Sequence, residues 1–191
     1  MSDTADDLAW ETLAGEVAYT CPGFDVRHED VRLPDGTETD YDYLSEPPAV
    51  VILPFTSDGD LVVIEEWRQA VRRINRGLPV GGVEPDDEDY RAAAHRELRE
   101  ETGYEADRVV PLTTVEPANG IADSELHFFV AYDCEPAGDQ DLDVDETIHP
   151  STTDYEAFRA AIRDGDVRDG RAVLGVLYYD SFGIPDDATP T

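Results

Sequence analysis

The sequence predicts an α/β protein in which a small β-rich arm, residues 1–46, precedes a larger domain, residues 47–191. Apolar runs on both sides of the turn "TSDGD" within 49–67 are typical of a hairpin of buried strands. The segment 87–103 is rich in Ala, Leu, Arg and Glu and stops at Gly103, which is typical of a helix. With 191 residues and 40% hydrophobic content, the chain can bury a core.

The arm contains three short segments with partial alternation and β-forming residues: "GEVAYT", "FDVRHEDVRL" and "TDYDYL". A turn through Asp35 and Gly36 connects the last two, and Pro47 and Pro48 mark the end of the arm. Such a meander has too little apolar content to fold well alone. We therefore expect it to pack on the rest of the chain or on a second subunit.

The larger domain continues with a loop over 68–88, followed by the helix and by strands at 108–116 and 125–133. An acidic, turn-rich loop is predicted over 135–146. A helix then begins after Thr153 or Asp154 as the cap and stops at Gly165, and 170–182 is predicted to be a last helix.

The net charge of the chain limits the classes of molecule that it can bind. It has 45 Asp and Glu against 14 basic residues, all of them Arg, and a formal net charge of -31. Such a surface repels nucleic acid and anionic lipid, so we expect neither as a partner. No basic start followed by an apolar run marks a signal peptide, and no apolar run is long enough to span a membrane. These features favour a soluble, cytoplasmic protein. Cys21 and Cys134 are interpreted as free thiols, with one disulfide as the alternative.

The simplest interpretation of this acidity is a solvated coat of the kind seen in proteins adapted to high salt. Salt shortens the Debye length to roughly 3 Å at 1 M and so relieves the self-repulsion of the folded state. We therefore expect the unfolding temperature to fall as the ionic strength is lowered. Thermal melts followed by circular dichroism across a salt series measure this, and a melting temperature indifferent to salt contradicts the interpretation.

Three acids on the predicted helix require a separate explanation. Glu97, Glu100 and Glu101 are related as i, i+3 and i+4, so they project from one helix face, where like charges repel. One reading is an exposed Glu-rich helix. The other is a site for a divalent cation such as Mg²⁺, which takes carboxylate oxygens together with substrate phosphates. The glycines of the preceding loop, Gly81 and Gly82, allow a close backbone approach that adds a carbonyl ligand.

The spacing around these acids favours the metal site. From Gly82, five residues lead to Glu88 and seven more lead to "RELREETGY", residues 96–104. This pattern resembles the Nudix box. The resemblance implies an α/β/α sandwich with a mixed sheet and hydrolysis of a diphosphate linked to a nucleoside, with water as nucleophile and Mg²⁺ or Mn²⁺ as cofactor. It implies these site residues: Glu97, Glu100, Glu101 and the Gly81 carbonyl as metal ligands, Arg96 as the residue orienting the glutamates, and Gly82, Glu88 and Gly103 as the structural residues of the box.

Outside the box, Val31 to Tyr179 resembles the ADP-ribose pyrophosphatase branch of the family, through "VRLPDG", "VVIEEWRQ", "GLPVGG" and "AIRDGDVRDGRAVLGV". That resemblance implies a homodimer that exchanges its arms, Arg68 as a substrate contact, and a general base from the late acidic loop. "LDVDETI" offers Glu146 for that base, with Asp145 beside it.

The chain departs from that branch at several places. Gly77 stands where a glutamate is usual, and Asn119-Gly120 replaces a proline-glycine pair. One extra residue before Glu88 makes Gly81 and Gly82 compete for the role of the box glycine. Other substrates therefore stay open: coenzyme A, NADH, a dinucleoside polyphosphate or a GDP-sugar. Two further alternatives are a non-catalytic nucleotide-binding regulator and an acidic interaction protein without a ligand. His95 and His127 are weaker candidates for catalysis.

Overall fold

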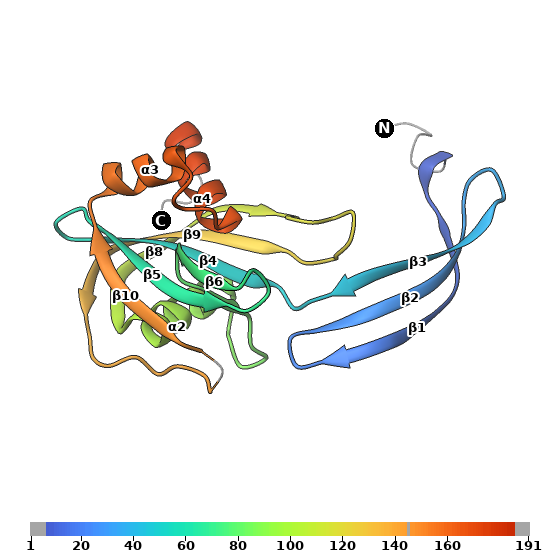
Figure 1. The fold of residues 1–191 in the computed structure, drawn as a ribbon, viewed down its shortest axis with the longest axis horizontal. Coiled ribbons are helices and arrows are strands. Elements are labelled where there is room, and N and C mark those ends of the chain that lie inside the picture. Colours follow the sequence, from blue (N-terminus) through green and yellow to red (C-terminus); the bar gives the residue numbers. More distant parts are fainter. Residues whose placement is uncertain (1–6, 145, 186–191) are drawn as a thin grey trace. The chain divides into compact units, whose positions relative to one another are not determined.

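A computed structural model describes residues 7–144 and 146–185. The chain divides into two compact units (Figure 1). The first comprises the described residues up to Pro47 together with Glu116–Glu125, and the second comprises Pro48–Val115 and the chain from Leu126 onward. The segment Glu116–Glu125, which connects two strands of the larger unit, thus belongs with the arm.

The first unit contains an antiparallel sheet with the order β1 (Glu11–Cys21), β2 (Phe24–Arg32) and β3 (Glu38–Ser45). The segment 116–125 joins it through the Ser45 hydroxyl, which donates to Asp123 at 2.8 Å, and through a parallel bridge between Leu44 and Ala122. Strand β1 is exposed along nearly its whole length. The predicted β arm is therefore present as a meander.

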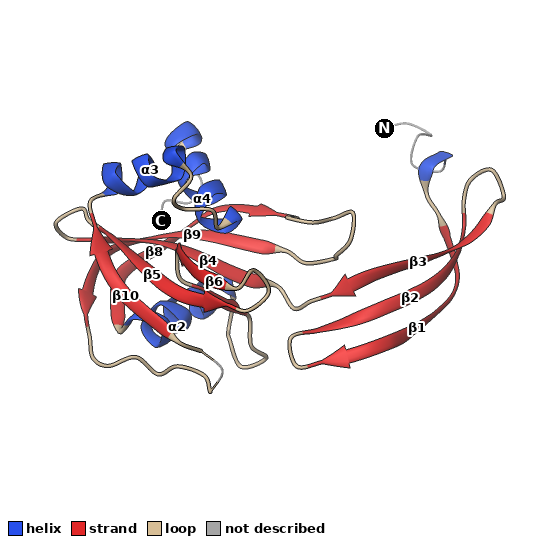
Figure 2. Cartoon of the chain, in the orientation of Figure 1, coloured by secondary structure: helices blue, strands red, loops and turns tan. Residues whose placement is uncertain are grey.

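The second unit is built on a seven-stranded mixed sheet (Figure 2). Parallel pairing joins β4 (Ala49–Thr56) to β9 (Leu126–Pro136), whereas every other strand pair in this sheet is antiparallel. The strand order is β10-β5-β4-β9-β8, with β6 beside β5 and β7 beside β4. The other strands are β5 (Leu61–Arg68), β6 (Arg73–Gly77), β7 (Val80–Gly82), β8 (Tyr104–Val115) and β10 (Ile148–Thr153).

Helices cover both faces of this sheet (Figure 1). Side chains alternate along β4, so Val50 and Ile52 pack with α2 (Tyr90–Thr102) on one face. Val51 and Leu53 pack on the other face with α3 (Tyr155–Asp164) and α4 (Gly170–Phe182). The result is the predicted α/β/α sandwich. No helix in the described part of the chain is long and apolar enough to cross a membrane.

The helix boundaries follow their capping residues. Asp89 caps α2, Asp154 caps α3 and Asp169 caps α4, each with a side chain that accepts from backbone N–H groups of the first turn. Gly103 ends α2 with φ 74°, a left-handed conformation, and an added Cβ would overlap the carbonyl oxygen of Gly138. Residues 87–89, which the sequence placed at the start of this helix, precede it, with Asp89 as the cap.

Three strands were missing from the sequence prediction. Strands β6 and β7 lie within the predicted loop over 68–88, and β10 follows the acidic loop directly. Segments such as "RINRG" and "IHPSTT" carry charges, a proline and little apolar alternation, so their own composition does not favour strands. Pairing with β5, whose first four residues are buried, determines their conformation.

Candidate active site

The buried face of α2 carries two of the predicted metal ligands. Glu97 and Glu101 are 8% and 2% exposed and lie on the same face as Ala93, Ala94 and Leu98. The carboxylate of Glu101 accepts the backbone N–H of Val80, on β7, at 2.8 Å. Glu100 lies farther round the helix and is partly exposed. The helix therefore presents carboxyl groups toward the sheet, where apolar side chains would ordinarily pack.

Arg96 connects these acids to the loop before the helix. One of its terminal nitrogens donates to Glu97 at 2.7 Å and to Glu100 at 2.9 Å. The other donates to the carbonyl of Gly82 at 2.8 Å, and together with Nε it makes a two-pronged contact with Asp87. These hydrogen bonds raise the pKa of Arg96 and lower that of Asp87. Arg96 is thus positioned to orient the glutamates.

The structure distinguishes Gly81 from Gly82, which compete in the sequence, and also Asp87 from Glu88. An added Cβ on Gly81 would overlap the carboxylate of Glu97, whereas one on Gly82 would meet nothing. Gly81 is therefore the glycine whose missing side chain the fold requires. Similarly, Glu88 is exposed, and it is Asp87 that receives the contact from Arg96. In both cases the structural role falls one residue earlier in the loop than the motif counted from Gly82 predicts: on Gly81 instead of Gly82, and on Asp87 instead of Glu88.

Two further acids interact electrostatically with those on the helix. We define the glutamate cluster as Glu66 on β5, Glu97 and Glu101 on α2, and Glu146 in the loop before β10. The pKa of Glu97 is raised to about 7 and that of Glu101 to about 8, mainly by burial, and the charge of Glu146 contributes to both shifts. Burial also raises the pKa of Glu66, with a smaller contribution from Glu146. Glu66 is not among the site residues predicted from the sequence. Asp145 lies outside the described residues.

Two arginines approach this cluster. Arg68 forms an ion pair with Glu66 at 2.8 Å, because residues two apart on a strand share a face. Arg171, in the first turn of α4, is held by a two-pronged contact to the buried carboxylate of Asp169, and its charge lowers the pKa of Glu66. Gly77 lies against Asp169, since a Cβ there would be 3.5 Å from the Asp169 carboxyl carbon. Asp169 and Arg171 were also missed, although Asp169 could have been found as the cap of the predicted last helix.

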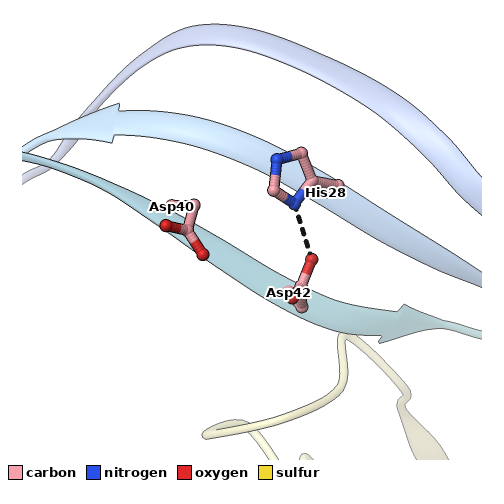
Figure 3. A group of neighbouring side chains, drawn as sticks. All are labelled: His28, Asp40 and Asp42. Atoms are coloured by element: carbon pink, nitrogen blue, oxygen red, sulfur yellow. Dashed lines mark hydrogen bonds and ion pairs between the residues drawn. The ribbon is translucent and has the colours of Figure 1, made fainter.

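The donor set of the cluster fits a hard divalent cation, because it consists of buried and partly buried carboxylate oxygens and Gly81 leaves room for the carboxylate of Glu97. The predicted ligands Glu97, Glu100 and Glu101 do not form a compact group of three metal-ligating side chains, and Arg96 donates to Glu97 and Glu100. Among the described residues, the one compact group of three metal-ligating side chains lies elsewhere: His28, Asp40 and Asp42, on β2 and β3 (Figure 3). There His28 pairs with Asp42 at 2.8 Å, which raises the pKa of the histidine.

The remaining candidates lie apart from these contacts. His127, on β9, stacks on Tyr90 with ring centroids 3.8 Å apart and hydrogen bonds to Thr114 at 2.9 Å. Burial lowers the pKa of His95, which makes it a poor cation. Cys21 and Cys134 are free cysteines, as expected.

The mixed sheet between helices, with a glutamate-bearing helix after a glycine loop, places the chain in a known class. The NUDIX domain family matches residues 45–169, and the chain belongs to this family. It is a Nudix hydrolase. Enzymes of this class generally use a divalent metal ion.

Among curated proteins, the chain is similar to the ADP-ribose pyrophosphatase of Bacillus subtilis (strain 168), with 28% identity over 172 residues that cover 90% of this chain and 92% of that protein. An ADP-ribose pyrophosphatase of Mycobacterium tuberculosis is 27% identical over 173 residues, covering 88% and 82%. The methanol dehydrogenase activator of Bacillus methanolicus is 29% identical over 169 residues, covering 88% and 91%.

A solved structure described as an ADP compounds hydrolase has the same fold, with a TM-score of 0.79 and 24% sequence identity over 91% of this chain and 93% of that one. The family match and the two ADP-ribose pyrophosphatases among the relatives confirm the resemblance to that branch found in the sequence.

Proposed function

We propose that the chain hydrolyses the diphosphate bond of ADP-ribose or a related nucleoside diphosphate sugar, giving a nucleoside monophosphate and a sugar phosphate, with Mg²⁺ or Mn²⁺ as cofactor. The observation that carries the proposal is the glutamate cluster, in which burial, with a smaller contribution from neighbouring carboxylates, raises the pKa of Glu97 and Glu101 on the Nudix helix. Carboxyl groups whose pKa is raised in this way are a sign of a functional site, because their charged forms lower stability unless a cation binds. The similarity to two ADP-ribose pyrophosphatases supports the choice of substrate.

Glu97 and Glu101 would hold the cofactor, with Glu100 and the carbonyl of Gly81 as further ligands. When bound, the metal would supply charge neutralisation at the diphosphate oxygens. The residues of the chain itself would do the rest. Arg96 would keep the glutamates oriented, and the loop carboxylate of Glu146 would accept the proton of the attacking water.

Arg68 and Arg171 would contact the substrate as cations beside the acidic cluster. Each is already paired with a carboxylate, Glu66 and Asp169 respectively, which fixes the direction of its guanidinium group. A guanidinium held in this way can offer its remaining N–H groups to a phosphate without a large loss of side-chain entropy. Arg171 supplies such a cation, because it is held by Asp169, the residue that lies against Gly77.

A substrate panel tests the proposal. The purified protein is incubated with ADP-ribose, NADH, coenzyme A, a dinucleoside polyphosphate and GDP-mannose, each with Mg²⁺ or Mn²⁺ and at high and low salt, and products are identified by mass. We expect AMP and ribose 5-phosphate from ADP-ribose at the highest rate, and no products in the presence of EDTA. If another substrate is cleaved faster, it replaces ADP-ribose as the proposed substrate. If no substrate is cleaved, the chain is better explained as a nucleotide-binding regulator.

We further propose that the β arm, residues 1–46, mediates a homodimer and lies on the substrate side. Its exposed strand β1 carries Leu13, Val17 and Tyr19, which are 39%, 43% and 60% exposed. Apolar side chains on an unpaired sheet edge are typical of a surface that a partner covers. Light scattering after size-exclusion chromatography should give twice the mass of the chain, and Val17→Asp should shift the protein toward the monomer. A monomeric wild type contradicts the proposal.

A further inference from the structure

Three arginines surround a cavity in the second unit, at β6 and in the segment that connects α3 to α4. The cavity has a volume of about 280 Å³ and is lined by Arg73, Asn75, Arg76, Gly165, Asp166 and Arg168. In a chain with 14 arginines and 45 acidic residues, a random surface depression would be lined mainly by carboxylates. This cavity instead gathers three cations around one acid.

Neutral groups hold two of these arginines and an aromatic ring lies under the third. Arg73 donates through Nε to the side-chain oxygen of Asn75 at 2.9 Å, and Arg168 donates through Nε to the carbonyl of Gly165 at 2.8 Å. The guanidinium of Arg76 lies 5.5 Å from the centre of the Phe158 ring. The terminal nitrogens of Arg73 and Arg168 are not used by these contacts.

None of the three forms an ion pair within the described residues. By contrast, the other arginines of α3 and α4 all do: Arg159 with Glu156 and Asp180, Arg163 with Asp164, and Arg171 with Asp169. Acidic partners are abundant in this chain, yet no described carboxylate pairs with the three guanidinium groups gathered at this cavity, so most of its positive charge is left uncompensated. An unpaired cation cluster of this kind is typical of a site that binds an external anion.

The charge and size of the cavity define the ligand. Three guanidinium groups and the carboxylate of Asp166 give a formal charge of about +2 at neutral pH. Guanidinium groups match the geometry of phosphate oxygens, with which they form paired hydrogen bonds. The volume lies below the roughly 300–1,000 Å³ of clefts that enclose drug-sized ligands, so it suits a small anion better than a whole nucleotide.

We propose that Arg73, Arg76 and Arg168 form a binding site for a doubly charged phosphate group, either inorganic phosphate or the phosphate of a small ester. This site is separate from the glutamate cluster, because none of its lining residues contributes to that cluster. Its occupancy does not depend on the proposed hydrolysis, so the two proposals can fail independently.

Isothermal titration calorimetry tests the site, with inorganic phosphate as the probe, EDTA present and the ionic strength held constant with sodium chloride. We expect saturable binding to the wild type. Arg73→Gln and Arg168→Gln should each weaken it on the order of tenfold or more, because each removes a charged hydrogen-bond donor. Arg163→Gln is the matched control, since it removes the same charge from an exposed pair on α3 and should leave the affinity unchanged. Far-ultraviolet circular dichroism establishes that each variant is folded.

Ribose 5-phosphate and AMP, titrated in parallel, distinguish the two sources of phosphate. Tighter binding of ribose 5-phosphate than of inorganic phosphate would assign the site to a phosphate ester, and equal or weaker binding would assign it to the free anion. Both results support the site. The absence of saturable phosphate binding, or an equal loss of affinity in Arg163→Gln, would overturn it. So would phosphate affinity that is retained when Arg73 and Arg168 are both replaced.

Discussion

Replacing Glu101 by Gln is expected to abolish hydrolysis and, at the same time, to stabilise the metal-free protein at pH 8. A metal-ion contribution of several kcal/mol to the transition state corresponds to about a 10³-fold or greater loss of kcat. Gln keeps an oxygen that can accept the N–H of Val80, so the contact between α2 and β7 persists. What disappears is the negative charge in a position that is only 2% exposed.

The gain in stability follows from the direction of the pKa shift. Burial raises the pKa of Glu101 from 4.5 to about 8, so the folded protein binds a proton that the unfolded chain releases. The contribution of Glu101 to the stability of the metal-free wild type should therefore be fully present below about pH 4.5. It should be lost as the pH rises to about 8. A loss of about 2 to 4 kcal/mol is expected across this window. Glu101→Gln should flatten this dependence.

Thermal melts in EDTA between pH 5 and pH 9 measure the effect, and Mg²⁺ should raise the melting temperature of the wild type at pH 8 more than that of the variant. Glu65→Gln is the matched control, because Glu65 is an exposed acid on the neighbouring strand β5. It should retain the activity and the pH dependence of the wild type. Full activity in Glu101→Gln would falsify its role as a ligand.

Replacing Arg96 by Ala is expected to lower the free energy of unfolding by about 3 to 5 kcal/mol, the range found when one partner of a buried ion pair is removed. Asp87 and Glu97, whose side chains are 7% and 10% exposed, would then be left without their partner. The loop would also lose the hydrogen bond to the carbonyl of Gly82. Activity should fall together with stability, because the glutamates would no longer be oriented.

Two single substitutions in the loop test which acid Arg96 binds. Asp87→Asn should lower the free energy of unfolding by about 1 to 3 kcal/mol, since it weakens a charged, two-pronged hydrogen bond. Glu88→Gln, the adjacent control, should change it by less than about 0.5 kcal/mol, because Glu88 is exposed. Urea denaturation at pH 7 measures both. Equal losses for Asp87 and Glu88 would contradict the contact seen in the structure.

The fold class, the arm and the helices α2, α3 and α4 were predicted from the sequence. So was the location of the candidate site on α2. These features depend on local signals: apolar periodicity, capping aspartates and terminal glycines at Gly103 and Gly165. The spacing within α2 was equally local, which is why Glu97, Glu100 and Glu101 could be grouped without a structure.

The features missed from the sequence depend on tertiary contacts. Strand β10 and residue Glu66 meet through the pairing of Ile148 with Glu66, over 80 residues apart in the chain. Arg171 reaches the cluster because α4 packs on the sheet, and nothing in "RDGRAV" indicates that its arginine faces inward. In the loop before α2, the motif spacing favoured Glu88 over Asp87, and only the position of the Arg96 side chain distinguishes the two.

Asp169 connects the first turn of α4 to the candidate active site, because it contacts both the backbone of that turn and the side chain of Arg171. Its carboxylate accepts the backbone N–H groups of Arg171 and Ala172, which begin α4, and it also holds the guanidinium of Arg171. A ligand that draws Arg171 away would therefore loosen the first turn of a helix that packs against the opposite face of the sheet from α2. The hydrogen-exchange rates of the Arg171 and Ala172 amides should therefore report whether a ligand occupies the candidate active site.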